Sequence, residues 1–228
     1  MLAAILFDLD GTIANTDPFH YQIWREMLLD YGIEIDEIFY KSRISGKLNP
    51  EILQDILPNL SPADGEKFAE DKEAIFRQKA QNLQPLNGFS ELVAWTEKHQ
   101  LKRALVTNAP RANVEFMLET LGIKEIFQTI VIAEDCVAGK PDPAPYQTAL
   151  DNLGIIAEQA IALEDSPSGI RAAVGAGVRT IGVASTHQPK LLQEIGAFMT
   201  IPDFTDLHLW TFLNSLSESS LSVSNRTV

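Results

Sequence analysis

The segment Leu2–Thr12 reads LAAILFDLDGT and joins a short apolar run to two aspartates. An apolar run of this length that ends in a glycine turn is typical of a fully buried strand. Because side chains alternate along a strand, Asp8 and Asp10 can point the same way, and Gly11 lets the backbone turn sharply away from them. Two neighbouring carboxylates at the end of a buried strand repel each other, so they need a cation or a shared proton.

Paired carboxylates in this position suit phosphoryl transfer. One can attack phosphorus and form an aspartyl-phosphate, while its neighbour protonates the leaving group and later takes a proton from water. A magnesium ion can offset the clustered charge and bind the phosphate oxygens. The alternative is an ordinary strand-to-loop turn, in which aspartate and glycine are common.

Composition restricts the class of protein. The chain has 228 residues, enough for one large or two small domains, and its 45% hydrophobic and 21% charged residues are ordinary for a soluble globular protein. No apolar run approaches the length of a membrane span, and Met1–Phe7 lacks the basic leader of a signal peptide. The single cysteine, Cys136, fits a reducing cytoplasm, and the net charge of −13 disfavours nucleic acid and anionic membrane as partners. We expect a cytoplasmic protein that binds neither, as a monomer or weak homo-oligomer.

Strand-like runs recur along the chain and alternate, in its second half, with amphipathic helical patterns. The expected strands are Leu2–Asp8, Lys102–Thr107, Thr129–Ala133, Ala160–Glu164, Val178–Val183 and Phe198–Ile201, and the later helices are Ala112–Leu121, Ala144–Leu153, Gly169–Gly175 and Pro189–Ile195. This alternation predicts an α/β fold, a doubly wound parallel sheet with helices on both faces. Ligands bind such sheets beyond the carboxyl ends of the strands, where Asp8, Thr107 and the pair Glu164 and Asp165 fall.

About 90 residues separate Gly11 from the strand at Lys102, far more than one crossover helix needs. Helical patterns fill most of this stretch, at Phe19–Tyr31, Pro50–Leu57 and Ser61–Gln81, before a break near Pro85 and a crossover helix at Phe89–His99. We predict an α-helical cap domain of residues 15–83 inserted into an α/β core domain of residues 1–14 and 84–214. The alternative is that these helices pack on the sheet as part of one domain. The serine-rich segment 215–228 is expected to be a flexible tail.

Four motifs follow one another at the ends of the expected strands. They are FDLDGT at 7–12, Thr107-Asn108, GKPDP at 139–143 and EDSPSG at 164–169. In this order they resemble the haloacid dehalogenase superfamily of phosphatases, and within it the subgroup of beta-phosphoglucomutase and small sugar-phosphate phosphatases. The resemblance covers Leu2 to about Gly182 and implies a Rossmann-like core with Asp8 as the nucleophile and Asp10 as the general acid/base.

The resemblance also implies the metal and phosphate ligands. Asp8, the backbone carbonyl of Asp10, and Asp165 would hold Mg²⁺, with Glu164 helping directly or through water; oxygen ligands suit such a hard cation. The alternative for Glu164 and Asp165 is a solvated loop pair. Phosphate contacts are expected from Gly11, Thr107, Asn108 and Lys140, because a helix start favours anions and an ammonium can neutralise the transferring phosphoryl group. The alternatives are a threonine that merely ends a strand and a solvated lysine.

Four residues of the cap are further candidates for substrate contact: His20, Lys47, Asn49 and Lys72. Related enzymes often carry a histidine near the acid/base aspartate and a lysine matching Lys72; the alternatives are a polar helix-start residue and a solvated helix face. One departure concerns Asn49, which stands where the mutase has an arginine that grips a second phosphate. Asparagine cannot make the bidentate phosphate contacts of arginine, and Lys47 would replace it less well, so hydrolysis is favoured over mutase chemistry.

We therefore predict a Mg²⁺-dependent phosphoric monoester hydrolase that acts on a small phosphorylated metabolite such as a sugar phosphate. One alternative is a phosphosugar mutase resembling beta-phosphoglucomutase. Another, of a different class, is a non-catalytic phospho-ligand-binding protein on the same fold. A dehalogenase is disfavoured, since the resemblance implies that dehalogenases lack the second aspartate, here Asp10.

Overall fold

The computed structural model describes the backbone of residues 1–224 and the side chains of residues 1–216. Its centre is a sheet of six parallel strands in the order β3-β2-β1-β4-β5-β6. The strands are β1 (Ala4–Phe7), β2 (Lys102–Thr107), β3 (Thr129–Ile132), β4 (Ala160–Glu164), β5 (Arg179–Val183) and β6 (Met199–Ile201). This sheet confirms the predicted α/β fold and the six expected strands, each within two residues at either end.

The topology places β1 at the switch point of the sheet. From β1 the chain runs outward through β2 and β3, then returns to place β4 on the other side of β1. Phe7 pairs with Leu105 of β2 and Leu163 of β4, so the residues that follow these three strands emerge side by side. The crevice at such a switch point is where open α/β sheets bind ligands.

Helices cover both faces of the sheet. The alternation along β1 sends Ile5 and Phe7 to one face and Ala4 and Leu6 to the other. The first face packs against α5 (Phe89–Lys98), α6 (Arg111–Leu121) and α10 (Leu207–Ser224), and the second against α7 (Ala144–Leu153), α8 (Pro167–Gly175) and α9 (Pro189–Ile195). Two buried layers therefore hold β1 and the position of the residues at its end.

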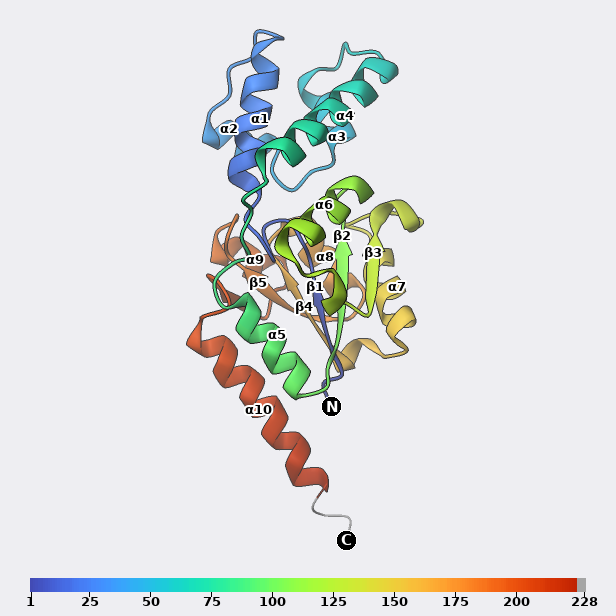
Figure 1. Cartoon of the computed structure of the whole chain (residues 1–228), viewed down its shortest axis with the longest axis vertical. Helices are drawn as coiled ribbons and strands as arrows, with labels where there is room; N and C mark the ends of the chain where they lie inside the picture. The colour runs from blue at the N-terminus through green and yellow to red at the C-terminus, as the bar shows by residue number, and fades with distance from the viewer. Residues whose placement is uncertain (225–228) are drawn as a thin grey trace.

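Four helices lie apart from these layers, beyond the carboxyl ends of the strands (Figure 1). They are α1 (Asp17–Leu29), α2 (Glu37–Arg43), α3 (Asn49–Ile56) and α4 (Pro62–Lys79), here called the helical insert. The insert has a hydrophobic cluster of its own around Trp24, Tyr40 and Phe68. Ser61 caps α4 as its Ser-Pro-Ala-Asp start predicts, since its hydroxyl accepts a 3.2 Å hydrogen bond from the backbone N–H of Asp64.

Two helices were absent from the sequence prediction. The short α2 has little apolar periodicity and depends on Asp36, whose side chain caps it by accepting from the N–H of Phe39 at 2.7 Å. Most of the predicted flexible tail is also helical, because α10 continues to Ser224; residues 225–228 lie outside the described residues. Buried Leu209 and Leu213, four residues apart, anchor α10 on the sheet in spite of its serine-rich composition.

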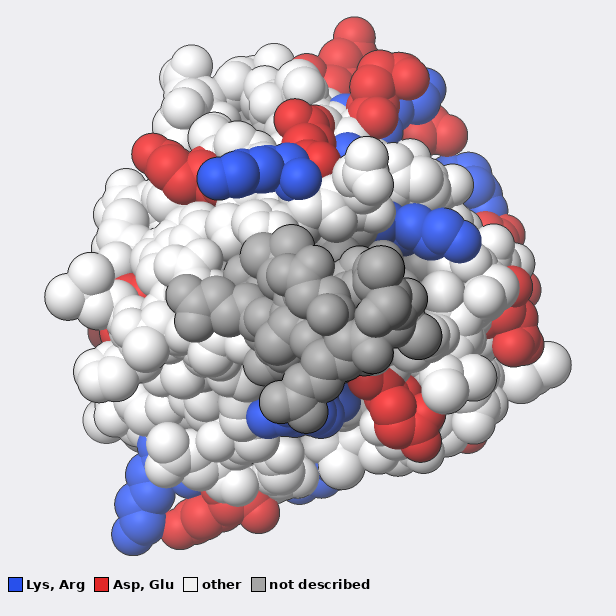
Figure 2. Space-filling view, turned by 90° about the horizontal axis from the view of Figure 1, so that it is seen from below, with Lys and Arg blue, Asp and Glu red and all other residues white. Residues whose placement is uncertain are grey.

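The end of the molecule opposite the insert carries acidic and basic side chains scattered over a largely uncharged surface (Figure 2). Within residues 1–224, we find no helix whose length and apolar character would suffice to cross a membrane.

Candidate active site

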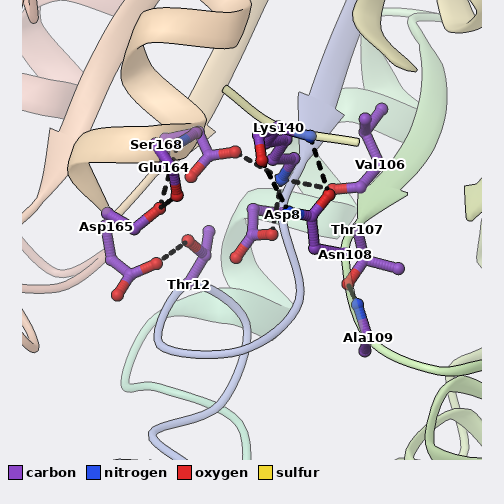
Figure 3. Close-up of polar contacts among 12 residues, drawn as sticks. Asp8, Thr12, Val106, Thr107, Asn108, Ala109, Lys140, Glu164, Asp165 and Ser168 are labelled. Atoms are coloured by element: carbon purple, nitrogen blue, oxygen red, sulfur yellow. Dashed lines mark hydrogen bonds and ion pairs between the residues drawn. The ribbon is translucent and has the colours of Figure 1, made fainter. Parts of the chain in front are cut away.

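Three carboxylates meet where β1 and β4 end. Asp8 directly follows β1, Glu164 is the last residue of β4, and Asp165 comes next. One carboxylate oxygen of each lies within 4.8 Å of the others, and all three side chains are buried. Figure 3 shows Glu164 and Asp165 together on one side of Asp8. The pairing of Phe7 with Leu163 explains the meeting, because it brings the two strand ends into register.

Lys140 reaches into this cluster from the loop before α7. Its Nζ donates to Asp8 Oδ1 at 2.7 Å, to Glu164 Oε1 at 2.5 Å and to the carbonyl of Val106 at 2.8 Å (Figure 3). Only 4% of Lys140 is exposed, so it is not a solvated lysine. Asn108 fixes the loop, because its Oδ1 accepts from the N–H of Lys140 at 2.9 Å and its Nδ2 donates to the carbonyl of Lys140 at 3.0 Å.

The pKa values of Asp8, Asp165 and Lys140 reflect a shortage of positive charge around the three carboxylates. Burial raises the pKa of Asp8 to about 7; the Glu164 charge adds to the rise and Lys140 opposes it. Burial likewise raises the pKa of Asp165 well above its ordinary value, helped by the charges of Asp8 and Glu164. Burial lowers the pKa of Lys140, but Asp8 and Glu164 outweigh it and raise that pKa above its ordinary value. The single ammonium therefore does not balance the three carboxylates.

The cluster fits a hard divalent cation. Within the described residues, Glu164 Oε2 is buried and has no hydrogen-bond partner, whereas Oε1 accepts from Lys140 and from the Tyr146 hydroxyl at 2.5 Å. Asp165 is oriented by Thr12 and Thr186, whose hydroxyls donate to its two carboxylate oxygens. An unpartnered oxygen beside two further carboxylates supplies the ligand type that Mg²⁺ prefers.

Asp10 lies outside the carboxylate cluster and faces the insert. Its Oδ1 accepts from the Thr16 hydroxyl at 2.8 Å and lies 3.7 Å from Nε2 of His20. The His20 ring stacks on Phe76 at 4.4 Å between centroids, and its Nδ1 is buried with no partner among the described residues. Asp10 is thus held by α1 and the segment before it, with its carboxylate at the cavity described below.

Two glycines leave room for the carboxylates. Gly11 has a φ of +81°, and a Cβ there would overlap the carboxylate of Asp165. A Cβ at Gly169, in the first turn of α8, would overlap the carboxylate of Glu164. Glycine is therefore required at position 11 by the backbone conformation and by the lack of room for a Cβ. At position 169 it is required only by the lack of room.

We expect Gly169→Ala to lower the free energy of unfolding by about 1–3 kcal/mol, the usual cost of overpacking a buried site. Gly175→Ala in the same helix is the matched control, because a Cβ there would lie 3.5 Å from Pro143, an ordinary contact. Its effect should stay within about 1 kcal/mol, since alanine favours helix over glycine. Urea denaturation of both variants measures the difference, and equal stabilities would show that Glu164 is not confined by α8.

A cavity of about 560 Å³ separates the strand ends from the insert. Every site residue predicted from the sequence lines it except Glu164, which lies buried behind Lys140. Thr107 lines the core side; it is buried at the end of β2, and its hydroxyl accepts from the N–H of Ala109 at 2.9 Å (Figure 3). Lys47 lies exposed on the insert side, in the loop before α3.

The insert contributes a compact polar group around Glu73. Lys72 is only 4% exposed, so the interpretation of a solvated helix face is wrong; its Nζ donates to Glu73 Oε1 at 2.8 Å. Asn49 Nδ2 donates to the same oxygen at 2.6 Å, and Asn113 Nδ2, from α6, donates to Glu73 Oε2 at 2.7 Å. Asn49 and Lys72 therefore meet at one carboxylate that the sequence prediction did not include.

A sequence profile of the haloacid dehalogenase-like hydrolases matches residues 5–183, most of the chain. The chain belongs to this family. This membership confirms the family resemblance that the order of the four sequence motifs indicated.

The chain is similar to two phosphatases and to one phosphosugar mutase. It is 29% identical to validoxylamine A 7'-phosphate phosphatase of Streptomyces hygroscopicus subsp. limoneus, over 91% of this chain and 96% of that protein. It is 30% identical to a phosphorylated carbohydrates phosphatase of Thermotoga maritima, over 86% and 92% of the two chains. The crystal structure of beta-phosphoglucomutase from Clostridium difficile matches with a TM-score of 0.82 at 26% identity, over 97% of this chain and all of that one.

Several residues that build this hydrolase site carry no sequence signal. Tyr146 and Thr186 act through hydrogen bonds to Glu164 and Asp165, and they come from segments far from those carboxylates in sequence. Asn113 reaches Glu73 across 40 residues. Glu73 itself could have been found, because it directly follows the candidate Lys72 on the same helix.

Proposed function

We propose that the protein is a Mg²⁺-dependent phosphatase that hydrolyses a small phosphomonoester through an aspartyl-phosphate on Asp8. The main support is the buried Asp8 carboxylate at the cavity. Its Oδ1 lies 2.7 Å from Lys140 Nζ, and Glu164 and Asp165 lie beside it. The similarity to phosphatases of validoxylamine phosphate and of phosphorylated carbohydrates supports a sugar phosphate, or a metabolite like one, as the substrate.

In the first half of the proposed reaction, an Asp8 oxygen attacks phosphorus and the bond to the leaving oxygen breaks. Asp10 gives that oxygen its proton, so the alcohol leaves neutral. In the second half, water attacks the phosphorus of the aspartyl-phosphate, Asp10 takes the proton of the water, and inorganic phosphate departs. The reaction consumes one water and returns both carboxylates to their starting states.

The surrounding residues stabilise charge and orientation. Lys140 donates to Asp8 and can also donate to the transferring phosphoryl group, whose charge it offsets. Thr107 and the backbone after it can hold a phosphate oxygen at the start of α6, with Gly11 and Asn108 beside them. When bound by Asp8, Glu164, Asp165 and the Asp10 carbonyl, Mg²⁺ would supply positive charge to the phosphate oxygens.

The proposed role of Asp10 predicts a dependence on the leaving group. Asp10→Asn should lower kcat by ~10²–10⁴-fold for an alkyl phosphate, the range for loss of a general acid. It should lower the first step much less for para-nitrophenyl phosphate, whose leaving group needs no proton. Single-turnover rates on the two esters measure this, and equal losses on both would contradict the assignment.

A second candidate is a phosphosugar mutase, favoured by the similarity to beta-phosphoglucomutase in structure. A mutase must hold a bisphosphate intermediate while it turns over, and here Asn49 is engaged with Glu73. The deciding experiment supplies beta-glucose 1-phosphate with a trace of the 1,6-bisphosphate and follows glucose 6-phosphate and free phosphate. Dominant phosphate release supports the phosphatase, and fast isomerisation supports the mutase. Failure to turn over these sugars or any other phosphomonoester would favour a non-catalytic binding protein.

We also propose that residues 15–83 form a separate cap domain that opens and closes over the cavity. Its two connections to the core lie near Asn15 and Pro85, and contacts such as Ser168 Oγ to the Gly46 carbonyl, at 3.3 Å, would break on opening. Closure excludes water and strengthens the electrostatics of the site. We propose that the protein acts on its small phosphorylated metabolite as a monomer or weak homo-oligomer in the cytoplasm, a compartment that the single cysteine supports.

A further inference from the structure

Glu73 is a buried carboxylate at the cavity that the proposed mechanism does not use. It is 8% exposed and sits on α4, in the insert wall of the cavity. Its two oxygens accept three hydrogen bonds, from Lys72 and Asn49 on Oε1 and from Asn113 on Oε2. A carboxylate with this many donors is held in one position by α3, α4 and α6 together.

Glu73 carries its charge at neutral pH. Burial raises its pKa, but the charges of Lys72 and His20 and the hydrogen bonds from Lys72 and Asn49 outweigh that effect, so the pKa lies below its ordinary value. The Lys72 ammonium therefore faces a full negative charge 2.8 Å away. The pair is close to neutral when seen from the cavity, and Lys72 is not a free cation.

The remaining insert wall offers little positive charge in its place. Among the described residues that line the cavity there is no arginine, and Lys47 lies exposed at its edge. Trp24 contributes an apolar ring to this wall, 5.9 Å from Lys72 Nζ, and the amide of Asn49 is engaged with Glu73. A second phosphate on a substrate would carry about −1.5 to −2 charges into this wall, where Glu73 repels it.

We propose that Glu73 determines specificity by cancelling the charge of Lys72, so that the site accepts phosphomonoesters with a neutral, hydroxylated far end and rejects those with a second anionic group. This inference rests on the proposed phosphatase function, of which it defines the substrate class. Glu73 acts through Lys72 and the two asparagines and is a specificity-determining residue rather than a catalytic one.

Glucose 6-phosphate and glucose 1,6-bisphosphate test this directly, because they differ only in the second phosphate. The wild type should prefer the monophosphate in kcat/KM. Glu73→Gln should shift the ratio of the two kcat/KM values toward the bisphosphate by about 10- to 100-fold, mostly through KM, which is the scale of one hydrogen bond to a charged group. Glu66→Gln, which removes the same charge from an exposed position on α4, should leave the ratio unchanged.

A second variant is expected to change the ratio in the opposite direction, and it tests the inference even if Glu73→Gln folds poorly. Lys72→Gln leaves Glu73 without its cation and should shift the ratio further toward the monophosphate. Calorimetry measures the binding of both sugars in the presence of Mg²⁺. The wild type, Glu73→Gln and Lys72→Gln are each combined with Asp8→Asn for this measurement, so the specificity is decided even if neither sugar is turned over. Phosphate release with an unchanged ratio in Glu73→Gln overturns the inference alone, as does an equal shift in Glu66→Gln. No release from either sugar or any other phosphomonoester counts against the proposed function instead.

Discussion

Asp8→Asn is expected to lower kcat by ~10⁴–10⁶-fold, approaching the loss seen when an enzyme's nucleophile is removed. The substitution keeps the shape of the side chain and its place beside Lys140 but removes the attacking oxygen charge. Steady-state phosphate release from para-nitrophenyl phosphate measures the loss. A variant that kept a sizeable fraction of the wild-type rate would exclude the aspartyl-phosphate mechanism.

The same variant should fold, which separates a chemical effect from a structural one. Because burial raises the pKa of Asp8 to about 7, the metal-free folded protein binds more protons than the unfolded chain between about pH 4 and pH 7. Its free energy of unfolding therefore falls as pH rises through that window. Asp8→Asn lacks this titration and should lose less stability over it, whereas Asp151→Asn, exposed on α7, should follow the wild type.

The core of the fold was predictable because its strands are buried on both faces. All four residues of β1 are buried, and continuous apolar runs of this kind stand out in a sequence. The carboxyl end of each run also marks the site, since parallel strands end at one edge. Asp8, Thr107 and Asp165 follow or end adjacent strands, and register then brings their neighbours together.

Features such as α10 and the burial of Lys72 could not be predicted, because they depend on contacts between segments that are distant in the sequence. Leu209 and Leu213 hold α10 on the sheet, although its serine-rich composition alone predicts disorder. A solvated helix face was the alternative for Lys72, because a charge on an amphipathic helix usually faces water. It is buried because the Glu73 carboxylate compensates its charge, and Glu73 is held in turn by Asn113 from a helix of the core. The contact between Asn113 and Glu73 joins residues 40 positions apart and has no local sequence pattern, so the burial of Lys72 required the structure.

Removal of divalent metal is the second change expected to stop turnover. The reason is the imbalance between three buried carboxylates and the single ammonium of Lys140, together with the unpartnered Oε2 of Glu164. Exhaustive chelation should reduce phosphate release to the background rate, and added Mg²⁺ should restore it. Full activity after chelation would contradict the metal requirement.

Thermal unfolding gives a readout that does not depend on turnover. Mg²⁺ at about 100 times its Kd should stabilise the folded protein by about 2.7 kcal/mol, which for a chain of this size corresponds to a rise in Tm of roughly 5–10 °C. Asp165→Asn should lose most of this rise, because it removes one ligand charge from the cluster, while Asp151→Asn should keep all of it. The rise should also shrink as pH falls below about 7, since protons then compete with the metal for Asp8. A Tm that rises equally in Asp165→Asn and the wild type would place the ion elsewhere, and the carboxylates at the ends of β1 and β4 would then need another explanation.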